Sequence, residues 1–228
     1  MSVLRHIPNA LTCANLVCGC LGIISLFTNK IEPAYFIWAA CVFDFFDGFA
    51  ARLFKVSSPI GKELDSLADM VSFGVLPALA IYTWIGASTT SQYLPFVAIF
   101  IAVCSALRLA KFNIDENQSE SFIGVPTPAN ALFLTALPFL PEALRNVVFS
   151  PYALTSIAIV FALLLVAPLP LFALKFKNFG WSGNQLRFTF LVVSVLLLGL
   201  FQAGAIPFII LFYIGASLGS RLVGVETK

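Results

Sequence analysis

Charged side chains are scarce in this sequence. Of its 228 residues, 11% are Asp, Glu, Lys or Arg, whereas 60% are hydrophobic, and the mean hydropathy is +0.97. Such an apolar composition excludes a water-soluble globular domain and is typical of a polytopic protein surrounded by membrane lipids. The formal net charge of +2 is too small for a nucleic-acid-binding surface, so no nucleic acid is expected as a partner.

Side chains that bind soft metals or form disulfides are also few. The one histidine, His6, precedes the first apolar run and is interpreted as an interfacial residue. The five cysteines form no C-x2-C pair, and all lie within apolar runs: Cys13, Cys18, Cys20, Cys41 and Cys104. We interpret them as small packing residues, because an odd number of cysteines inside a membrane favours neither disulfides nor metal ligands.

Most of the remaining sequence consists of long apolar runs. A helix needs about 20 such residues to cross a bilayer. The runs predict an all-α fold, a polytopic membrane helical bundle of about eight transmembrane helices in a single domain over residues 1–228. The expected spans are 10–28, 33–54, 66–86, 92–110, 128–141, 151–174, 188–203 and 205–222. The fifth run is short and contains two prolines, so its limits are the least defined.

Positive charges are unevenly distributed between the ends of these runs. With eight spans and a cytoplasmic N-terminus, the outer side receives Lys30 and Arg145. The cytoplasmic side receives Arg5, Arg52, Lys55, Lys62, Arg108, Lys111, Lys175, Lys177, Arg187, Arg221 and Lys228. Because Lys and Arg concentrate in cytoplasmic loops, the sequence predicts that both termini are cytoplasmic.

Four aspartates stand at the boundary between the second and third predicted spans. Asp44 and Asp47 are three residues apart, and Asp65 and Asp69 are four apart, so each pair shares one helix face. A polar turn with a helix-breaking proline separates the pairs. An acid facing lipid costs about 2.5–3.5 kcal/mol on insertion scales. The four acids are therefore expected to face the bundle interior or a wet cavity and to meet a positive charge.

A divalent cation is the natural partner for these acids, because Mg²⁺, Mn²⁺ and Ca²⁺ prefer carboxylate oxygens. Nearby, Gly48, Ala51 and Gly61 leave room for a bulky ligand, and Arg52 offers a guanidinium suited to phosphate. Together these residues predict a metal-dependent site for a phosphorylated ligand at the cytoplasmic end of the bundle. The alternative is that the acids are structural, each capping a helix or pairing with Arg52.

The same residues form the pattern D-x2-D-G-x2-A-R-x8-G-x3-D-x3-D, which resembles the signature of the CDP-alcohol phosphotransferase family. All eight positions are present: Asp44, Asp47, Gly48, Ala51, Arg52, Gly61, Asp65 and Asp69. The strings D-S-x-A-D-x-x-S-F-G-x-x-P, R-L-A-K-F-N and F-x-G-x-P-T-P-A are similar to the phosphatidylserine synthase branch of that family. The resemblance covers residues 8 to about 130.

This resemblance implies a chemistry. A phosphatidyl group would pass from CDP-diacylglycerol to L-serine, with release of CMP, in a prokaryotic inner or plasma membrane. It implies that the four aspartates bind two divalent ions, Mg²⁺ or Mn²⁺, and that Asp69 also accepts the proton of the acceptor hydroxyl. It further implies a homodimer. The catalytic core would cover about residues 8–175, with additional C-terminal spans at about 186–222.

Residues outside the four acids are assigned by the same resemblance. Asn9 and Thr12 share one face at the start of the first span, where they either cap the helix or line the nucleotide pocket. The nucleotide and diphosphate are expected to contact Asn9, Thr12, Asp44, Gly48, Ala51, Arg52, Gly61 and Asp65. Arg108 and Lys111 either bind the acceptor or a lipid phosphate, or extend to the lipid surface without a catalytic role.

Two other functions remain possible at this point. The same chemistry could use glycerol 3-phosphate or inositol phosphate as acceptor, although those acceptors should need more cations than Arg108 and Lys111 provide. A divalent-cation transporter could also place acids inside a membrane. Its acids would be expected near the bilayer midplane rather than at one membrane face.

Overall fold

The chain is helical throughout its described part, apart from one short strand pairing. The computed structural model describes residues 6–28, 30–56, 58–114, 122–172, 180 and 184–222. Its helices are α1 (Ile7–Thr28), α2 (Pro33–Leu53), α3 (Pro59–Asp69), α4 (Leu76–Ser88), α5 (Ile99–Ile114), α6 (Thr127–Thr135), α7 (Glu142–Val148), α8 (Pro151–Val166), α9 (Gln185–Phe201) and α10 (Ala205–Leu222). The two-residue strands β1 (Phe122–Ile123) and β2 (Pro170–Leu171) pair antiparallel. The prediction of a helical bundle is confirmed.

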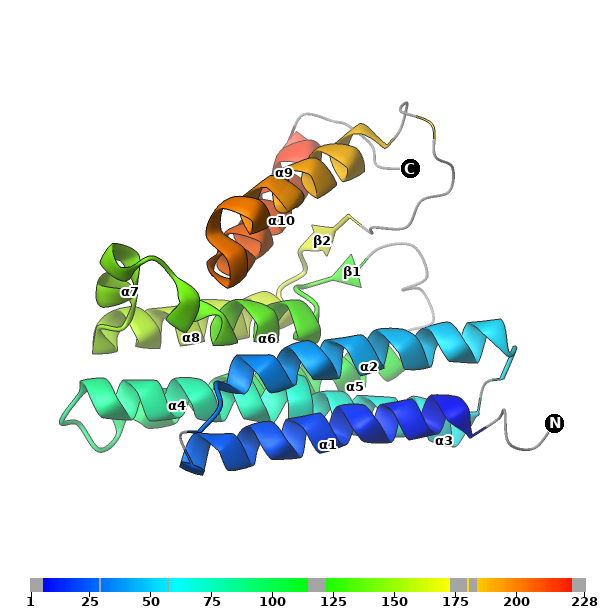
Figure 1. The fold of residues 1–228 in the computed structure, drawn as a ribbon, viewed down its shortest axis with the longest axis horizontal. Helices are drawn as coiled ribbons and strands as arrows, with labels where there is room; N and C mark the ends of the chain where they lie inside the picture. The colour runs from blue at the N-terminus through cyan, green and yellow to red at the C-terminus, as the bar shows by residue number, and fades with distance from the viewer. Residues whose placement is uncertain are drawn as a thin grey trace.

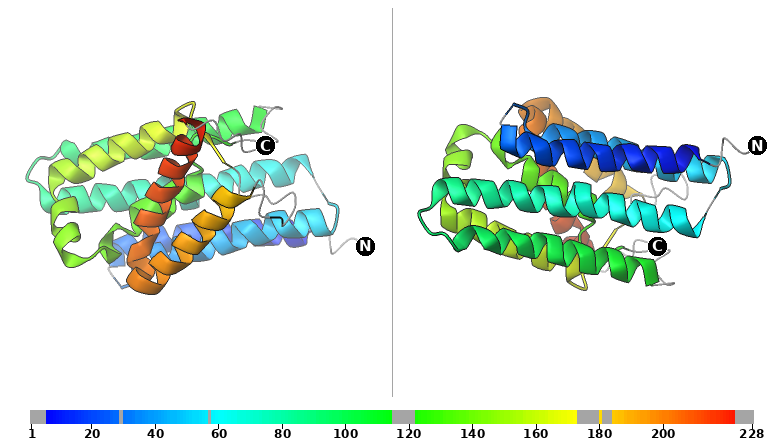
Figure 2. Two further views of the ribbon diagram at one scale, coloured as in Figure 1. Left: turned by 90° about the horizontal axis from the view of Figure 1, so that it is seen from above. Right: turned by 90° about the horizontal axis from the view of Figure 1, so that it is seen from below.

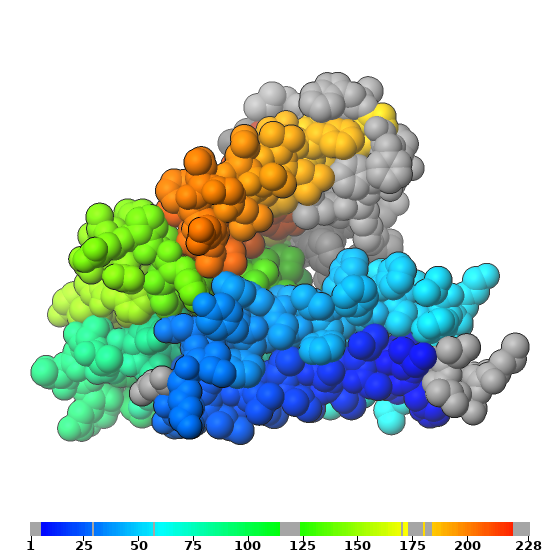
Figure 3. Space-filling model, in the orientation of Figure 1, coloured from blue at the N-terminus to red at the C-terminus, as the bar shows by residue number. Residues whose placement is uncertain are grey.

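The long helices lie side by side and form one bundle (Figures 1 and 2). Helix α1 packs along α2 and α3, and α5 packs along α8. Helices α9 and α10 form a hairpin that crosses the bundle obliquely (Figure 2). Figure 3 shows this hairpin as an orange block resting on the green part of the chain, where α10 contacts α6.

Membrane-spanning helices are fewer than the sequence predicts. Five stretches of the described chain are long and apolar enough to cross a bilayer: Ile7–Thr28, Pro33–Leu53, Pro59–Ser88, Leu94–Ile114 and Gln185–Ser220. A sixth is counted if α7 and α8, which are bent by 81° relative to each other, make one broken span. The polytopic membrane architecture is confirmed, whereas the count of eight spans is not reached.

Two local features explain the difference in the count. The predicted fifth span is the nine-residue α6, which ends at Thr135 and passes into a 3₁₀ turn, Leu137–Phe139. Pro138 lies in that turn and Pro141 follows it. Proline has no backbone N–H to donate to a helical hydrogen bond, and it disfavours the helical conformation of the residue before it, so the helix ends here. The last two expected spans, 188–203 and 205–222, correspond to α9 and α10, which separate at Gln202 with φ 49° and count together as one apolar stretch, Gln185–Ser220.

The outer faces of the helices are apolar, and a separate apolar core fills the interior. The core joins α4, α5, α6, α8 and α10 through fully buried side chains such as Ile81, Ile101 and Leu154. Large apolar side chains remain exposed on the outside, for example Ile24 on α1 and Leu200 on α9. An exposed apolar surface of this extent is stable in lipid and marks an integral membrane protein.

Small residues bring α1 close to the third span. A Cβ added to Gly19 would lie 2.5 Å from Oγ and 2.9 Å from Cα of Ser72. One turn further along α1, a Cβ at Gly22 would collide with Leu76 and approach Phe36. These two glycines therefore allow α1 to pack closely against the third span.

The third span contains a π-helical segment, η2 (Met70–Val75), directly after Asp69. Pro77, two residues beyond η2, has no N–H for the carbonyl of Phe73, and its ring crowds that carbonyl. A local widening of the helix relieves such crowding. The widened turn accommodates Pro77, and Pro59–Ser88 stays one helical stretch.

Both pairs of acids lie toward one end of the bundle. The start of α1, the turn between α2 and α3, and the end of α5 share that end in Figure 1, while the α1–α2 turn with Lys30 lies at the other. Arg52, Lys55 and Lys62 belong to the acidic end, as the positive-inside pattern requires. Arg5, Lys175, Lys177 and Lys228 lie outside the described residues, and the cytoplasmic assignment stays a prediction.

The close approach of α1 to η2 predicts a specific stability effect. Gly19→Ala places a methyl group against the Ser72 backbone and should destabilise the fold by about 1–3 kcal/mol. Gly215→Ala on α10, where an added Cβ meets nothing within 4 Å, is the matched control. Thermal unfolding in detergent should show a lower midpoint for Gly19→Ala alone; equal midpoints for both variants would contradict the packing described.

Candidate functional site

The acids are positioned by a tight connection between α2 and α3. Helix α2 ends at Leu53, and Lys55 then adopts a left-handed conformation with φ 52°. Helix α3 begins at Pro59, and the side chain of Ser58 caps it by accepting a hydrogen bond from the Gly61 N–H at 3.1 Å. This turn sets the last turns of α2 against the first turns of α3. The predicted pair of helices joined by a short loop is confirmed.

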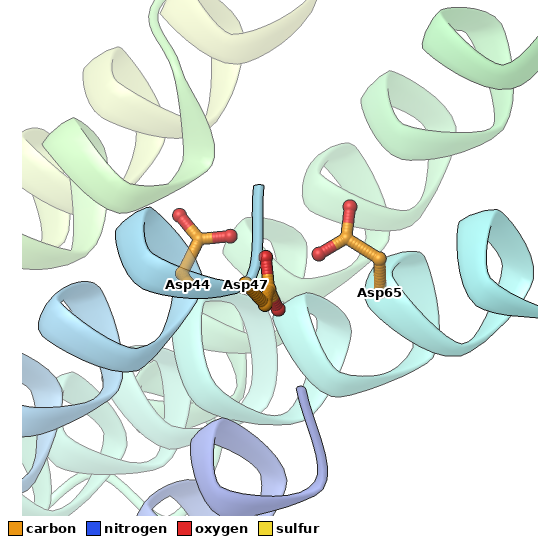
Figure 4. A group of neighbouring side chains, drawn as sticks. All are labelled: Asp44, Asp47 and Asp65. Carbon is orange, nitrogen blue, oxygen red and sulfur yellow. The ribbon is translucent and has the colours of Figure 1, made fainter. Parts of the chain in front are cut away.

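Three of the four carboxylates converge. Oxygen atoms of Asp44 and Asp47 on α2 and of Asp65 on α3 all lie within 4.8 Å of one another. Figure 4 shows the carboxyl groups of Asp44 and Asp65 directed toward each other across the space beside Asp47. In the described part of the chain, no lysine or arginine forms an ion pair with them, and Oδ1 of Asp65 is buried without a hydrogen-bond partner.

Two polar side chains of α1 donate hydrogen bonds to the acids. The Thr12 hydroxyl lies 2.7 Å from Oδ2 of Asp47 and 3.1 Å from the carbonyl oxygen of Pro8. The hydroxyl has one proton to donate, and it donates that proton to the Asp47 carboxylate, because this hydrogen bond is shorter and charge-assisted. The Asn15 amide donates to Oδ1 of Asp69 at 3.0 Å. Helix α1 therefore orients one acid of each pair.

The fourth acid lies apart from the cluster of three. Asp69 is 8% exposed and one helical turn deeper in the third span than Asp65. It remains within electrostatic range of Asp44, Asp47 and Asp65. Arg108 of α5 is within electrostatic range of both Asp69 and Tyr213 of α10. The segment η2, which begins directly after Asp69, packs against α5.

A cleft of about 580 Å³ opens above the cluster. Its walls come from the start of α1, the end of α2, the connecting turn and the start of α3. The lining residues are Pro8, Asn9, Thr12, Asp47, Gly48, Ala51, Lys55, Val56, Ser58, Gly61, Lys62 and Asp65. A volume of this size accommodates a nucleotide-sized ligand.

The two glycines of the cleft differ in what surrounds them. A Cβ added to Gly48 would meet no protein atom within 4 Å, so it would project into open space. A Cβ at Gly61 would come within 3.0 Å of Oγ of Ser58 and 3.1 Å of Oδ1 of Asn9. Gly48 therefore keeps room for a ligand, while Gly61 allows the capped start of α3 to approach α1.

Most of the predicted site residues come together, and two do not. Asn9, Thr12, Gly48, Ala51 and Gly61 line the cleft with two of the acids, and Thr12 bonds across to α2 instead of capping its own helix. Arg52 is exposed and absent from the lining, so it neither borders the described cleft nor pairs with the acids. Lys111 is exposed on α5, also outside the cleft.

Three further residues at the site are not among the sequence predictions. Asn15 follows Thr12 by three residues, so a polar stripe along an apolar helix could have indicated it. Lys55 and Lys62 line the cleft and supply its positive charge, and Nζ of Lys62 also donates to the carbonyl of Asn113 at 2.6 Å. Their position depends on the turn between the helices, which spacing alone does not reveal.

The three-carboxylate cluster fits a hard divalent cation. It offers only oxygen ligands, which suit Mg²⁺, Mn²⁺ or Ca²⁺. The unpartnered Oδ1 of Asp65 is an acceptor that lacks a protein donor. Like charges this close are unstable without a counter-ion. The chemistry of the site therefore agrees with metal binding between α2 and α3.

Comparisons with known proteins agree with this geometry. Residues 5–212 match the CDP-alcohol phosphatidyltransferase family. The chain is 41% identical over 141 residues to the CDP-diacylglycerol–serine O-phosphatidyltransferase of Bacillus subtilis (strain 168), covering 60% of this chain and 77% of that protein. Proteins with the same name from Helicobacter pylori (strain J99) and Methanocaldococcus jannaschii are 37% and 38% identical. Those matches cover 56% of this chain and 54% and 58% of the relatives.

The cluster predicts a measurable metal affinity. Asp65→Asn removes one of the three negative charges and should weaken Mn²⁺ binding by more than about tenfold. Substituting a residue that only hydrogen-bonds to a metal ligand already lowers metal affinity by about tenfold, and a direct ligand should matter more. Glu63→Gln, two residues away on the exposed side of α3, is the matched control. Titration of the purified protein with Mn²⁺ measures both affinities, and equal affinities would show that the metal binds elsewhere.

Proposed function

Because the chain belongs to the CDP-alcohol phosphatidyltransferase family, we propose that it transfers the phosphatidyl group of CDP-diacylglycerol to L-serine, giving phosphatidylserine and CMP. The relatives are named for CDP-diacylglycerol and serine, which supports both substrates. The observation that carries the proposal is the cluster of three carboxylates beneath an open cleft at one end of a membrane bundle. The enzyme acts in phospholipid biosynthesis.

Asp44, Asp47, Asp65 and Asp69 would hold two divalent ions, Mg²⁺ or Mn²⁺. When bound, such ions neutralise the diphosphate and stabilise the oxygen that leaves with CMP. The hydrogen bond from Thr12 fixes Asp47 before the ligand arrives. Preorganised ligands of this kind avoid a reorganisation cost during the reaction.

The cleft receives the cytidine and the diphosphate. Gly48 and Ala51 leave space on the α2 side, and Asn9 borders the same space from α1. Lys55 and Lys62 bring two positive charges to an anionic ligand, beside the contact expected from Arg52. The diacylglycerol chains would extend sideways into lipid along α2, where Phe45 and Phe49 are exposed and stacked.

Asp69 accepts the proton of the attacking hydroxyl. The serine oxygen forms a bond to the phosphorus attached to diacylglycerol, the bond from that phosphorus to the CMP oxygen breaks, and the proton moves to the carboxylate. Oδ1 of Asp69 is held by Asn15, which leaves Oδ2 for the proton. Burial keeps water from competing with serine as the acceptor.

Serine fits the charges around the site better than a phosphorylated acceptor. Glycerol 3-phosphate or inositol phosphate would bring a second phosphate, for which several cations are needed. On the α5 side of Asp69, Arg108 supplies one guanidinium, enough for a single carboxylate. A cation transporter, the alternative from another class, lacks support because the chain belongs to an enzyme family.

The wider arrangement of the enzyme is also part of the proposal. The site faces the cytoplasm of a prokaryotic inner or plasma membrane, both termini lie on that side, and two copies form a homodimer. One membrane domain covers residues 1–228, with the catalytic core at about 8–175 and the added spans at about 186–222. The excess of Lys and Arg at the acidic end of the bundle supports the orientation.

The proposed reaction predicts serine-dependent release of CMP. Purified protein with Mn²⁺ or Mg²⁺ and CDP-diacylglycerol should release CMP when serine is added. Asp69→Asn should lower the rate by about 100-fold or more, the usual contribution of a general base. Glu63→Gln should retain the wild-type rate. Release only with glycerol 3-phosphate or inositol phosphate would contradict serine as acceptor, and no release with any acceptor would contradict the enzyme activity.

The open space at Gly48 predicts a separation of folding from binding. Gly48→Ala meets no protein atom, so its unfolding midpoint should equal that of the wild type. Its methyl group would occupy the cleft and should raise the KM for CDP-diacylglycerol by about tenfold, as expected for a clash in a shaped pocket. Gly199→Ala on α9, which is equally uncrowded, is the control. An unchanged KM would show that the nucleotide does not contact Gly48.

A further inference from the structure

A second group of polar side chains lies inside the bundle, outside the cleft. Ser105 and Asn130 are 0% exposed and Thr127 is 1% exposed. The hydroxyl oxygens of Ser105 and Thr127, both amide atoms of Asn130 and Nε of Arg108 have no hydrogen-bond partner. Buried polar atoms are nearly always paired, because an unpaired one loses the hydrogen bonds that water would give it. These five atoms on α5 and α6 therefore lack the partner that a buried polar atom requires.

Helix register places this group beside Asp69. Ala131 of α6 packs in one cluster with Phe73 of η2. Thr127 lies one turn before Ala131, and Asp69 lies one turn before Phe73. Helix α6 packs against η2 and runs in the same direction as the third span in Figure 1, so this register would set Thr127 near the level of Asp69. Asn130, three residues after Thr127, shares its helix face.

Helix α5 supplies the opposite wall. The Ser105 Cβ lies 3.1 Å from the position of a Cβ added to Gly74 of η2. Helix α5 runs opposite to the third span (Figure 2), so Arg108, one turn after Ser105, is set back toward Asp69. The electrostatic interaction between Arg108 and Asp69 agrees with this register.

The donor cleft and this group lie on different sides of Asp69. None of Ser105, Arg108, Thr127 and Asn130 lines the cleft, which is formed by α1, α2 and α3. Tyr213 of α10, which interacts with Arg108, closes the far side, and its hydroxyl donates to the carbonyl of Phe172 at 2.8 Å. An acceptor held here would therefore approach Asp69 from the side opposite the leaving CMP.

We propose that Ser105, Arg108, Thr127 and Asn130 form the subsite that holds the amino and carboxyl groups of the amino-acid acceptor. The proposal rests on the proposed function. Arg108 pairs with the carboxylate, and the amide oxygen of Asn130 and the hydroxyl of Thr127 accept from the ammonium group. One cation for the carboxylate and neutral acceptors for the ammonium group match a zwitterionic amino acid. This binding mode leaves the serine hydroxyl free to reach Asp69.

Asn130→Leu tests this assignment, since the two side chains have similar size and leucine needs no hydrogen bonds. A merely structural asparagine would leave the KM for serine unchanged in this variant. If Asn130 belongs to the subsite, Asn130→Leu should raise the KM for serine by about tenfold or more, because a buried polar contact to the ligand is lost. The KM for CDP-diacylglycerol should stay within about twofold of the wild-type value. The unfolding midpoint should not fall, because an unpaired buried amide is removed.

Thr127→Val is the second variant, should Asn130→Leu fail to fold, and it carries the same expectation for serine. Ser194→Ala on α9 is the matched control, because its buried hydroxyl is also unpaired but belongs to another helix pair. Equal serine KM values for the wild type, both α6 variants and the control would overturn the subsite and leave the proposed function standing. A wild-type protein without serine-dependent CMP release would overturn the proposed function itself, and with it the occupant of the subsite.

Discussion

The repulsion among carboxylates at one end of a membrane bundle is the constraint on which the site depends. Oxygens of three aspartates within 4.8 Å repel one another by about 3 kcal/mol per pair at an effective dielectric constant of about 20. No lysine or arginine of the described chain pairs with them. The fold tolerates the cluster because Thr12 donates to Asp47 and because the cluster lies beside an open cleft. A divalent cation bound to the three carboxylates would complete the balance of charge.

The rest of the bundle serves to hold these charges in place. Gly19 brings α1 against η2, and only this close approach lets Asn15 reach Asp69. The capped start of α3 at Ser58 fixes Asp65 relative to α2. Asp69 then lies near the cleft on one side and, in the proposed arrangement, near the unpaired polar side chains of α5 and α6 on the other. In that arrangement the donor and the acceptor would meet at one carboxylate while lipid covers the outer faces.

Periodicity and spacing were enough to predict the helical membrane bundle, the paired acids and the small residues beside them. They did not predict the span count, because α6 ends after nine residues at a 3₁₀ turn that contains Pro138, and because α9 and α10, predicted as two spans, count as one apolar stretch, Gln185–Ser220. Arg52 was assigned to the cleft from its place in the motif, yet its side chain points outward from the last turn of α2. Asn130 gave no signal in the sequence, since only tertiary packing reveals that its amide is buried and unpaired.

The most direct test of the account is to locate the metal. Diffraction data collected near the manganese absorption edge, from crystals grown with Mn²⁺, would show the position of the bound metal by anomalous scattering. The account predicts anomalous density bordered by carboxylate oxygens of Asp44, Asp47 and Asp65, at the foot of the cleft. Density at another place, or none at these residues in Mn²⁺-saturated protein, would contradict the claim that this cluster is a metal site.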